Sequence, residues 1–291
     1  MSERVPVARS GILRLECPDT VGVVAAVAAL LADRDITISE AQQFNDGRKS
    51  RFFMRALFRS VSGELLDLDA LREAFAPICE RFAMVWDIDD AGRAPRVLIG
   101  VSRHGHCLFE LINAWRAGAL PIEIAGVFSN HEDMRSFTEW QGLAYHCLPA
   151  APATRADQEA RLLELAEDGG ADLLVLARYM QILSPSLCAR FAGRCINIHH
   201  SFLPAFKGAR PYHQAHSRGV KIIGATAHYV TDKLDEGPII EQAVERVDHG
   251  HSVKDFIDIG RGIEARVLAR AVKWHAERRI MLSGQRTIVF A

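Results

Sequence analysis

Four short segments after residue 95 are continuously apolar, and this pattern constrains the fold more than any other feature of the sequence. They are RVLIGVS (96–102), IEIAGVFS (122–129), DLLVLA (172–177) and CINIHH (195–200), and stretches with helical periodicity separate them. Apolar strands that alternate with helices are typical of a parallel sheet covered on both faces. Residues 96–291 are therefore predicted to form one α/β domain with a mostly parallel, Rossmann-like sheet.

The end of the chain adds two strands and a long helix to this pattern. VKIIGATAHYV (220–230) and PIIEQAVERV (238–247) follow each other closely, so we expect them to pair antiparallel. Strand 220–230 is also expected to lie beside strand 195–200. The apolar stripe that follows predicts a helix over about 252–280.

The first 90 residues have a different pattern. Strand-like segments at 11–17, 36–44, 50–58 and 83–89 alternate with two helical stripes, and Asn45-Asp46-Gly47 is a strong hairpin signal. Pro77 lies inside the second stripe and is expected to kink that helix or end it early. The order βαββαβ predicts a ferredoxin-like domain over residues 1–90, and the turn-forming residues 91–95 are predicted to be a linker.

Composition and charge exclude several classes of protein. The 35 Lys and Arg residues balance the 36 Asp and Glu residues, which argues against non-specific nucleic-acid binding. No run of 18 apolar residues predicts a membrane span, and the N-terminus does not resemble a signal peptide. Six scattered cysteines without a CxxC pair are typical of reduced thiols, so we expect a cytoplasmic protein.

The clearest candidate site lies where the fourth apolar strand ends. Asn197 and His199 are two residues apart near the end of CINIHH, so their side chains should face the same way, with His200 facing the other way. Ligands of open α/β sheets bind at the carboxyl ends of strands. The segment SFLPAFKG follows at once, which places both side chains at a junction between a strand and a loop.

A group of acidic residues follows strand 220–230, in the segment TDKLDEGPII. One interpretation is a solvated surface turn. The other is that Asp235 lies beside His199, where it would orient the imidazole and favour its protonated form. Asn197 could then donate a hydrogen bond to a developing oxyanion, a combination suited to attack on a carbonyl carbon.

Metal binding is the rival chemistry, because His213 and His216 form an H-x2-H pair. The spacing matches neither H-E-x-x-H nor a cysteine-based zinc site, so no metal is predicted. G-x-S-x-G, Walker A and G-x-G-x-x-G motifs are also absent from the sequence.

The run INIHHSFLPAFKG, followed by TDKLDEGPII, resembles the catalytic domain of folate-dependent formyltransferases. The resemblance places Asn197, His199 and Asp235 on the catalytic Asn, His and Asp of that family. ARYMQIL (177–183) resembles the folate-binding loop, in which Gln181 stands where many relatives have Arg. The substrate contacts implied or expected are Tyr179, Met180, Gln181, Ile182, Leu183, Ser201 and His228.

The segment CPDTVGVVAAVAALLADRDITI (17–38) resembles an ACT domain, a module that commonly binds amino acids at an interface between copies. The resemblance implies an amino-acid effector, with glycine and methionine as the expected candidates, and a homo-oligomer. Asp19, Gly22 and Val23 are the expected regulatory contacts.

An ACT domain ahead of a formyltransferase-like domain resembles the formyltetrahydrofolate deformylases. That resemblance implies hydrolysis of 10-formyltetrahydrofolate to tetrahydrofolate and formate without a cofactor. The loop SRHGHCL (102–108) lacks the Gly- and Asn-rich phosphate cradle of glycinamide ribonucleotide transferases, and His200, Arg210 and Tyr212 are expected to close the acceptor side. The alternatives are a formyltransferase with an amine acceptor and an amino-acid-sensing protein whose second domain is inactive.

Overall fold

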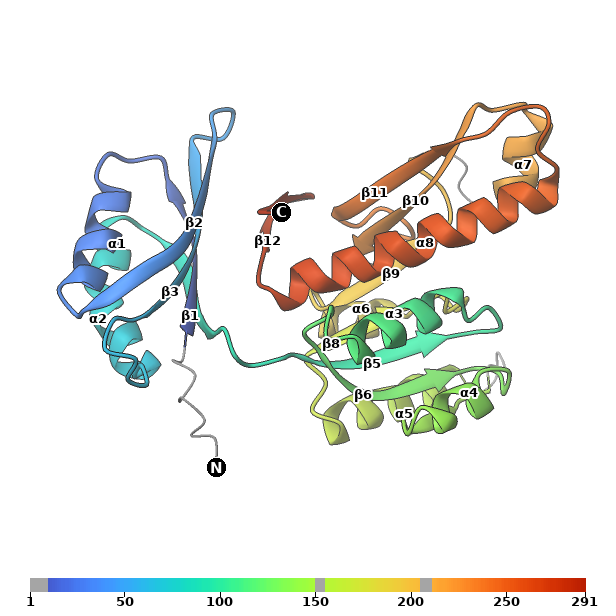
Figure 1. The fold of residues 1–291 in the computed structure, drawn as a ribbon, viewed down its shortest axis with the longest axis horizontal. Helices are drawn as coiled ribbons and strands as arrows, with labels where there is room; N and C mark the ends of the chain where they lie inside the picture. The colour runs from blue at the N-terminus through green and yellow to red at the C-terminus, as the bar shows by residue number, and fades with distance from the viewer. Residues whose placement is uncertain (1–9, 150–154, 205–210) are drawn as a thin grey trace. The chain divides into compact units, whose positions relative to one another are not determined.

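The chain folds into two compact units, which are described one at a time. The computed structural model describes residues 10–149, 155–204 and 211–291 (Figure 1). The first unit comprises Met1–Ala94 together with Glu277–Met281 and Phe290–Ala291, and the second comprises Pro95–Ala276 and Leu282–Val289. Among the described helices, none is long and apolar enough to cross a membrane.

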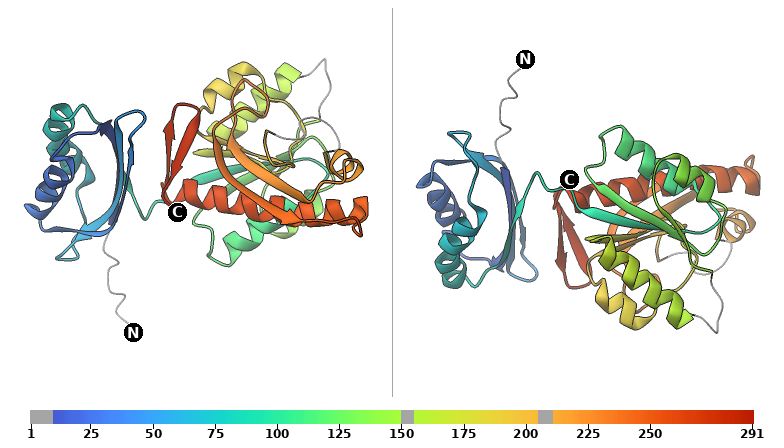
Figure 2. Two further views of the ribbon diagram at one scale, coloured as in Figure 1. Left: turned by 90° about the horizontal axis from the view of Figure 1, so that it is seen from above. Right: turned by 90° about the horizontal axis from the view of Figure 1, so that it is seen from below.

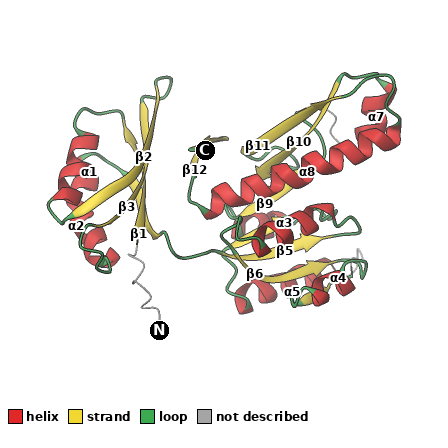
Figure 3. Cartoon of the chain, in the orientation of Figure 1, coloured by secondary structure: helices red, strands yellow, loops and turns green. Residues whose placement is uncertain are grey.

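The first unit is an antiparallel sheet with the strand order β2-β3-β1-β4. Helices α1 (Val23–Ala32) and α2 (Leu68–Arg81) cover one face of it (Figures 1 and 3). This arrangement confirms the predicted ferredoxin-like βαββαβ order. The strands are β1 (Ser10–Pro18), β2 (Ile36–Asp46), β3 (Arg51–Ser60) and β4 (Val85–Asp90).

Helix α2 continues past its internal proline to Arg81, so Pro77 does not end the helix early, and the alternative, a kink at Pro77, stays a prediction. Proline in a helix interior costs about 3 kcal/mol. Leu71, Phe75 and Cys79 are buried against the sheet at helical spacing on both sides of Pro77, and this packing offsets the cost. The side chain of Asp67 caps the helix by accepting from two backbone N–H groups.

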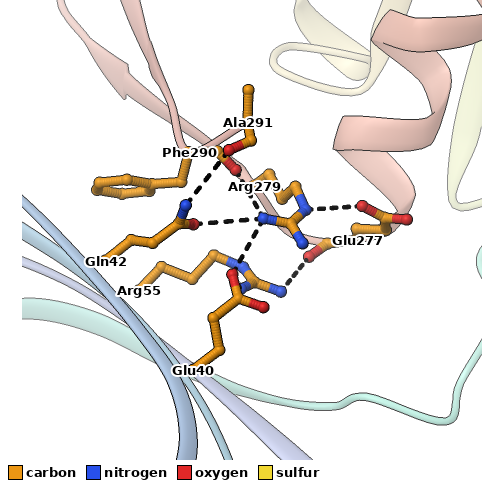
Figure 4. Close-up of polar contacts among 7 residues, drawn as sticks. All are labelled: Glu40, Gln42, Arg55, Glu277, Arg279, Phe290 and Ala291. Atoms are coloured by element: carbon orange, nitrogen blue, oxygen red, sulfur yellow. Dashed lines mark hydrogen bonds and ion pairs between the residues drawn. The ribbon is translucent and has the colours of Figure 1, made fainter.

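The other face of this sheet carries charged side chains, because alternate residues of β3 point away from the helices. Arg55 is only 3% exposed there, and its guanidinium bonds to Glu40 at 3.1 Å and to the carbonyl of Glu277 at 3.0 Å. Arg279 donates to the same carboxylate of Glu40 at 3.1 Å. The end of the chain thus returns to the first unit, a feature that the sequence prediction did not include. Figure 4 shows the cluster of Glu40, Gln42, Arg55, Glu277, Arg279, Phe290 and Ala291.

The second unit is built on a seven-stranded sheet with the order β11-β10-β9-β8-β5-β6-β7. The adjacent strands β9, β8, β5, β6 and β7 are parallel to one another. Strand β10 pairs antiparallel with both β9 and β11. These pairings confirm the mostly parallel sheet and the antiparallel pair. The strands are β5 (Arg96–Val101), β6 (Glu123–Ser129), β7 (Tyr145–Cys147), β8 (Leu173–Leu176), β9 (Cys195–His199), β10 (Ile222–Tyr229) and β11 (Ile239–Arg246).

Helices cover both faces of the larger sheet, as Figure 2 shows. α3 and α8 pack against each other on one face, and α5 and α6 lie on the other, where Leu162, Leu165 and Leu187 join the core. The long helix α8 ends at Ala276, earlier than predicted. The helices are α3 (His106–Arg116), α4 (Arg135–Trp140), α5 (Arg155–Asp168), α6 (Pro185–Arg190), α7 (Pro211–Ser217) and α8 (Val253–Ala276), and β12 (Ile280–Ser283) and β13 (Arg286–Val289) form a small C-terminal hairpin.

Candidate active site

A cavity of about 720 Å³ opens beside the carboxyl ends of β8 and β9. Residues after β8, at the end of β9, in the turn between β10 and β11, and on α8 line it. The strand order explains this convergence, because β8, β9 and β10 are adjacent in the sheet. The cavity lies where ligands bind in open α/β sheets.

The pairing of β9 with β10 places Asn197 directly opposite His228. Nδ2 of Asn197 lies 3.2 Å from Nε2 of His228, and Nδ1 of His228 lies 2.9 Å from the carbonyl of Tyr229. A carbonyl can only accept, so Nδ1 of His228 carries the proton and Nε2 accepts from the amide of Asn197. His228 therefore fixes the orientation of the Asn197 amide, whose second N–H is left for a ligand.

His199 and Asp235 form the second pair of the site. Nδ1 of His199 lies 3.2 Å from Oδ1 of Asp235, and His228 approaches the same oxygen at 3.7 Å. Burial raises the pKa of Asp235, but the hydrogen bond that Nδ1 of His199 donates outweighs burial, and the pKa lies well below its usual range. Nε2 of His199 is buried without a hydrogen-bond partner among the described residues, which suits it to a ligand in the cavity.

The turn that carries Asp235 is fixed by its backbone. Asp235 has a φ of 56°, a left-handed conformation that Asp and Asn tolerate better than most residues. A Cβ atom on Gly237 would lie 1.7 Å from the carbonyl oxygen of Tyr229, so this position requires glycine. Asp232 and Glu236 are exposed, whereas the side chain of Asp235 is only 13% exposed. Asp235 is thus not part of a solvated acidic surface.

His200 does not face away from His199, contrary to prediction. The strand ends at His199, so strict alternation stops there, and the two ring centroids are 5.1 Å apart with both rings lining the cavity. Burial, the charge of Arg178 and the neighbouring His199 lower the pKa of His200 to about 3. His200 is therefore neutral at physiological pH.

The predicted folate loop after β8 lines the cavity along residues 178–183. Met180 and Ile182 are exposed apolar side chains, and the backbone N–H of Met180 donates to Ser102 at 3.0 Å. The side-chain amide of Gln181 donates to the carbonyl of Met180. The loop therefore presents exposed apolar side chains to a flat ring, whereas the backbone N–H and carbonyl of Met180 already form hydrogen bonds within the protein.

The other predicted substrate contacts are more deeply placed. Tyr179 and Leu183 are buried in the core beneath the loop while still lining the cavity, and burial raises the pKa of Tyr179 to about 12. Ser201 is buried, its carbonyl accepts from Thr226 at 2.9 Å, and it lies outside the described residues that line the cavity. Arg210 belongs to residues 205–210, which lie outside the described residues.

Glu264 is a site residue that the sequence analysis missed. It is 1% exposed on α8, and it accepts hydrogen bonds from Tyr212 at 2.5 Å and from His106 at 2.8 Å. Arg178 lies 3.3 Å from it. Burial raises the pKa of Glu264, but these three partners outweigh burial and keep it ionised. The signal in the sequence was an acid on an apolar stripe, four residues before Leu268.

The only described group that could hold a metal by proximity is His106, Cys107 and Glu264, whose ligand atoms lie within 4.8 Å of one another. Both carboxylate oxygens of Glu264 already accept hydrogen bonds. Burial raises the pKa of the Cys107 thiol well above its usual value, which disfavours a thiolate ligand. Nε2 of His216 bonds to a backbone carbonyl. The carboxylate of Glu264 and the ring of His216 are thus occupied by hydrogen bonds, and Cys107 stays a thiol, so these side chains do not fit a metal centre.

The predicted regulatory residues lie where β1 leads into α1. Asp19 is exposed and accepts from Asn45 at 2.7 Å, and Gly22 precedes α1 with a φ of 97°. The Val23 side chain is 2% exposed in the core, so only its backbone could reach an effector. The first turn of α1 has no side-chain cap, which leaves backbone N–H groups for an anion.

Comparison with known proteins matches two family models to separate parts of the chain. A family model described as formyl transferase matches residues 95–272, and the ACT domain model matches residues 11–80. The chain is 48% identical to a formyltetrahydrofolate deformylase of Corynebacterium sp. over 99% of both chains, and 49% identical to that of Bacillus subtilis over 96% and 93%.

Solved structures show where the resemblance is complete and where it is partial. A formyltetrahydrofolate deformylase from Burkholderia mallei superposes with a TM-score of 0.92 at 51% identity, covering 97% of this chain and 100% of that chain. A glycinamide ribonucleotide transformylase from Symbiobacterium toebii superposes with a TM-score of 0.65 at 32% identity, covering 69% of this chain and 97% of that one.

Proposed function

The chain belongs to the formyltetrahydrofolate deformylase family, and from this premise we propose that it hydrolyses 10-formyltetrahydrofolate to tetrahydrofolate and formate. The observation that carries the proposal is the grouping of Asn197, His199 and Asp235 around one cavity. Proton transfer, orientation of the imidazole and an oxyanion donor are the three functions that attack on a formyl carbon requires.

His199 moves the proton in this reaction. As the oxygen of a water molecule bonds to the formyl carbon, Nε2 of His199 takes a proton from that water, and Asp235 stabilises the ring at Nδ1. The bond between carbon and N10 then breaks, and His199 returns the proton to N10. The formic acid released loses its remaining acidic proton to solvent as formate, so the atoms and charges balance.

Asn197 donates to the oxygen that becomes negatively charged in the tetrahedral intermediate. Its amide is already oriented, because one N–H group donates to Nε2 of His228. A donor that needs no reorganisation stabilises the transition state more than one that must first turn. His228 thus contributes to the site by holding Asn197.

The loop at residues 178–183 binds the pterin ring of the substrate. Met180 and Ile182 provide exposed apolar surface, and Gln181 lies between them on the loop. A pocket of several hundred Å³ that combines apolar walls with a few polar groups is typical for a ligand of this size. The reaction uses no cofactor, so EDTA should leave the turnover rate unchanged.

The first unit binds a small effector near the loop between Asp19 and Gly22, and copies of the chain associate through it. The uncapped first turn of α1 suits the carboxylate of an amino acid. Calorimetric titration with glycine and with methionine, each repeated on Asp19→Asn, tests the effector site, and analytical ultracentrifugation tests association.

The proposed location of the protein is the cytoplasm, because its six free cysteines suit a reducing compartment.

Product analysis tests the proposed hydrolysis. The purified protein with 10-formyltetrahydrofolate and no acceptor should release formate, and in oxygen-18 water the label should appear in that formate. Glycinamide ribonucleotide should not accelerate the formation of tetrahydrofolate. A rate that rises with added amine, with a formylated amine as the product, would identify a formyltransferase instead.

A further inference from the structure

His200 lies in the cavity without a hydrogen bond from either ring nitrogen to another described residue. Its ring lies 5.1 Å from that of His199 and 6.2 Å from that of Tyr212, measured between centroids. It also lines the same cavity as Asn197. A polar ring placed among the reacting groups, with no partner in the described protein, is available to a ligand or to water.

The protonation state of His200 decides what it can do there. With its pKa lowered to about 3, the ring keeps one nitrogen as a hydrogen-bond acceptor at neutral pH. The best general base has a pKa near the operating pH, and His200 lies about four units below it. His200 is thus suited to accept a hydrogen bond and poorly suited to take a proton.

A buried support holds the position of His200. Tyr212, whose ring centroid lies 6.2 Å from that of His200, donates its hydroxyl to Glu264. Gly260 lies one helical turn before Glu264 on α8, and a Cβ atom at this position would lie 2.2 Å from the ring of Tyr212. The missing side chain at Gly260 makes the space that Tyr212 occupies, and the carboxylate of Glu264 fixes its end.

We propose that His200 holds the hydrolytic water by accepting a hydrogen bond from it, and that Tyr212, Glu264 and Gly260 position His200 for this. The proposal deepens the proposed hydrolysis and rests on it. The two adjacent histidines then have different roles in the reaction. His200 orients the water so that its lone pair faces the formyl carbon, and His199 carries the proton.

Three substitutions test this role in the full-length protein. His200→Phe keeps a ring near His199 and Tyr212 but removes both nitrogens, so kcat should fall by about a hundredfold while KM for 10-formyltetrahydrofolate changes less than about threefold. His200→Gln keeps an acceptor oxygen and should retain about a tenth of kcat or more. His249→Gln makes the same change at an exposed histidine that does not line the cavity, and it should match the wild type.

Chemical rescue separates this role from a structural one. In His200→Ala, added imidazole should restore turnover in a saturable manner, which a residue needed only for packing would not show. The proposal is overturned if His200→Phe keeps kcat within threefold of wild type while formate is the product, or if KM alone changes. If the wild type releases no formate, the proposed hydrolysis itself fails. If His200→Phe does not fold, the kcat of His200→Gln and the imidazole rescue of His200→Ala test the proposal in its place.

Discussion

Nδ1 of His199 lies 3.2 Å from Oδ1 of Asp235, and the aspartate reaches it from a backbone with a φ of 56°. Asn and Asp are the residues other than glycine that best tolerate this conformation. Asp235 therefore supplies two things at once, a negative charge and a side chain that fits a left-handed position. A substitution that separates the two will show which of them the reaction needs.

Asp235→Asn makes that separation. The amide fits the same backbone but cannot stabilise a positive charge on His199, so kcat should fall by at least about a hundredfold. Folate binding, measured by fluorescence titration, should stay within a few-fold of wild type, because the loop at 178–183 is unchanged. Near-normal turnover in the folded variant would remove Asp235 from the mechanism.

The depressed pKa of His200 makes the stability of the protein depend on pH. Its ordinary value is 6.5 and its folded value about 3, so between these limits the unfolded chain binds more protons. The contribution of His200 to the free energy of unfolding should thus be fully present above pH 6.5 and should decline as the pH falls toward 3. Burial, Arg178 and His199 lower this pKa, whereas Glu264 and Asp235 raise it.

Urea denaturation at pH 7 and pH 5 measures this dependence. The loss of stability between the two pH values should be smaller in His200→Gln than in the wild type. His104 and His146 also have lowered pKa values and contribute to the wild-type loss, so the difference between the proteins is the relevant quantity. Equal losses in both proteins would show that His200 is not held neutral by the fold.

The C-terminal return stabilises the first unit through Arg279. This residue is 20% exposed, and its guanidinium donates to Glu40, Gln42 and the carbonyl of Phe290. Arg279→Ala removes the donor to Gln42 and Phe290 and leaves Glu40 with Arg55 alone, so it should lower the free energy of unfolding by about 1–3 kcal/mol. The effect should appear as faster hydrogen exchange in β2 and β3.

An exposed arginine is the control for this prediction. Arg266 is 57% exposed and pairs with Glu245, so Arg266→Ala should cost less than about 0.5 kcal/mol. If the two variants lose the same stability, the polar cluster of Figure 4 is no more than a surface ion pair.

The sequence predicts both sheets because their signals are local and periodic. It also predicts Asn197, His199 and Asp235, because these residues lie in two short motifs that each stand near the end of a strand. The predicted orientation of His200 was wrong, because alternation along β9 cannot reveal that the strand ends at His199, one residue before His200. The C-terminal return to the first unit was missed, because it joins Arg279 to Glu40 across 239 positions and has no periodic signal.

Glu264 shows the same limit for a single side chain. On a helical wheel it is a charged residue within an apolar stripe, and only its partners explain it. Those partners, His106, Arg178 and Tyr212, come from three other parts of the chain. Burial of an ionised acid is costly unless such partners surround it, so their convergence had to be seen in three dimensions.

Two glycines of α8 should respond in opposite directions to the same substitution. In a helix interior, alanine is favoured over glycine by about 1 kcal/mol, because it restricts the unfolded chain. A Cβ atom on Gly262 would have no neighbour within 4 Å among the described residues, so Gly262→Ala should raise the free energy of unfolding by up to about 1 kcal/mol.

Gly260→Ala should do the reverse. Its Cβ atom would lie 2.2 Å from the Tyr212 ring, which is buried and fixed at its hydroxyl by Glu264, so the ring cannot move aside without breaking that hydrogen bond. Overpacking of this kind costs about 1–3 kcal/mol. A displaced Tyr212 would also shift His200, so kcat should fall while KM changes little. Urea denaturation and steady-state kinetics of the two variants, compared side by side, check both effects. If Gly260→Ala is as stable and as active as Gly262→Ala, neither the packing of Tyr212 nor its support of His200 is as close as the structure indicates.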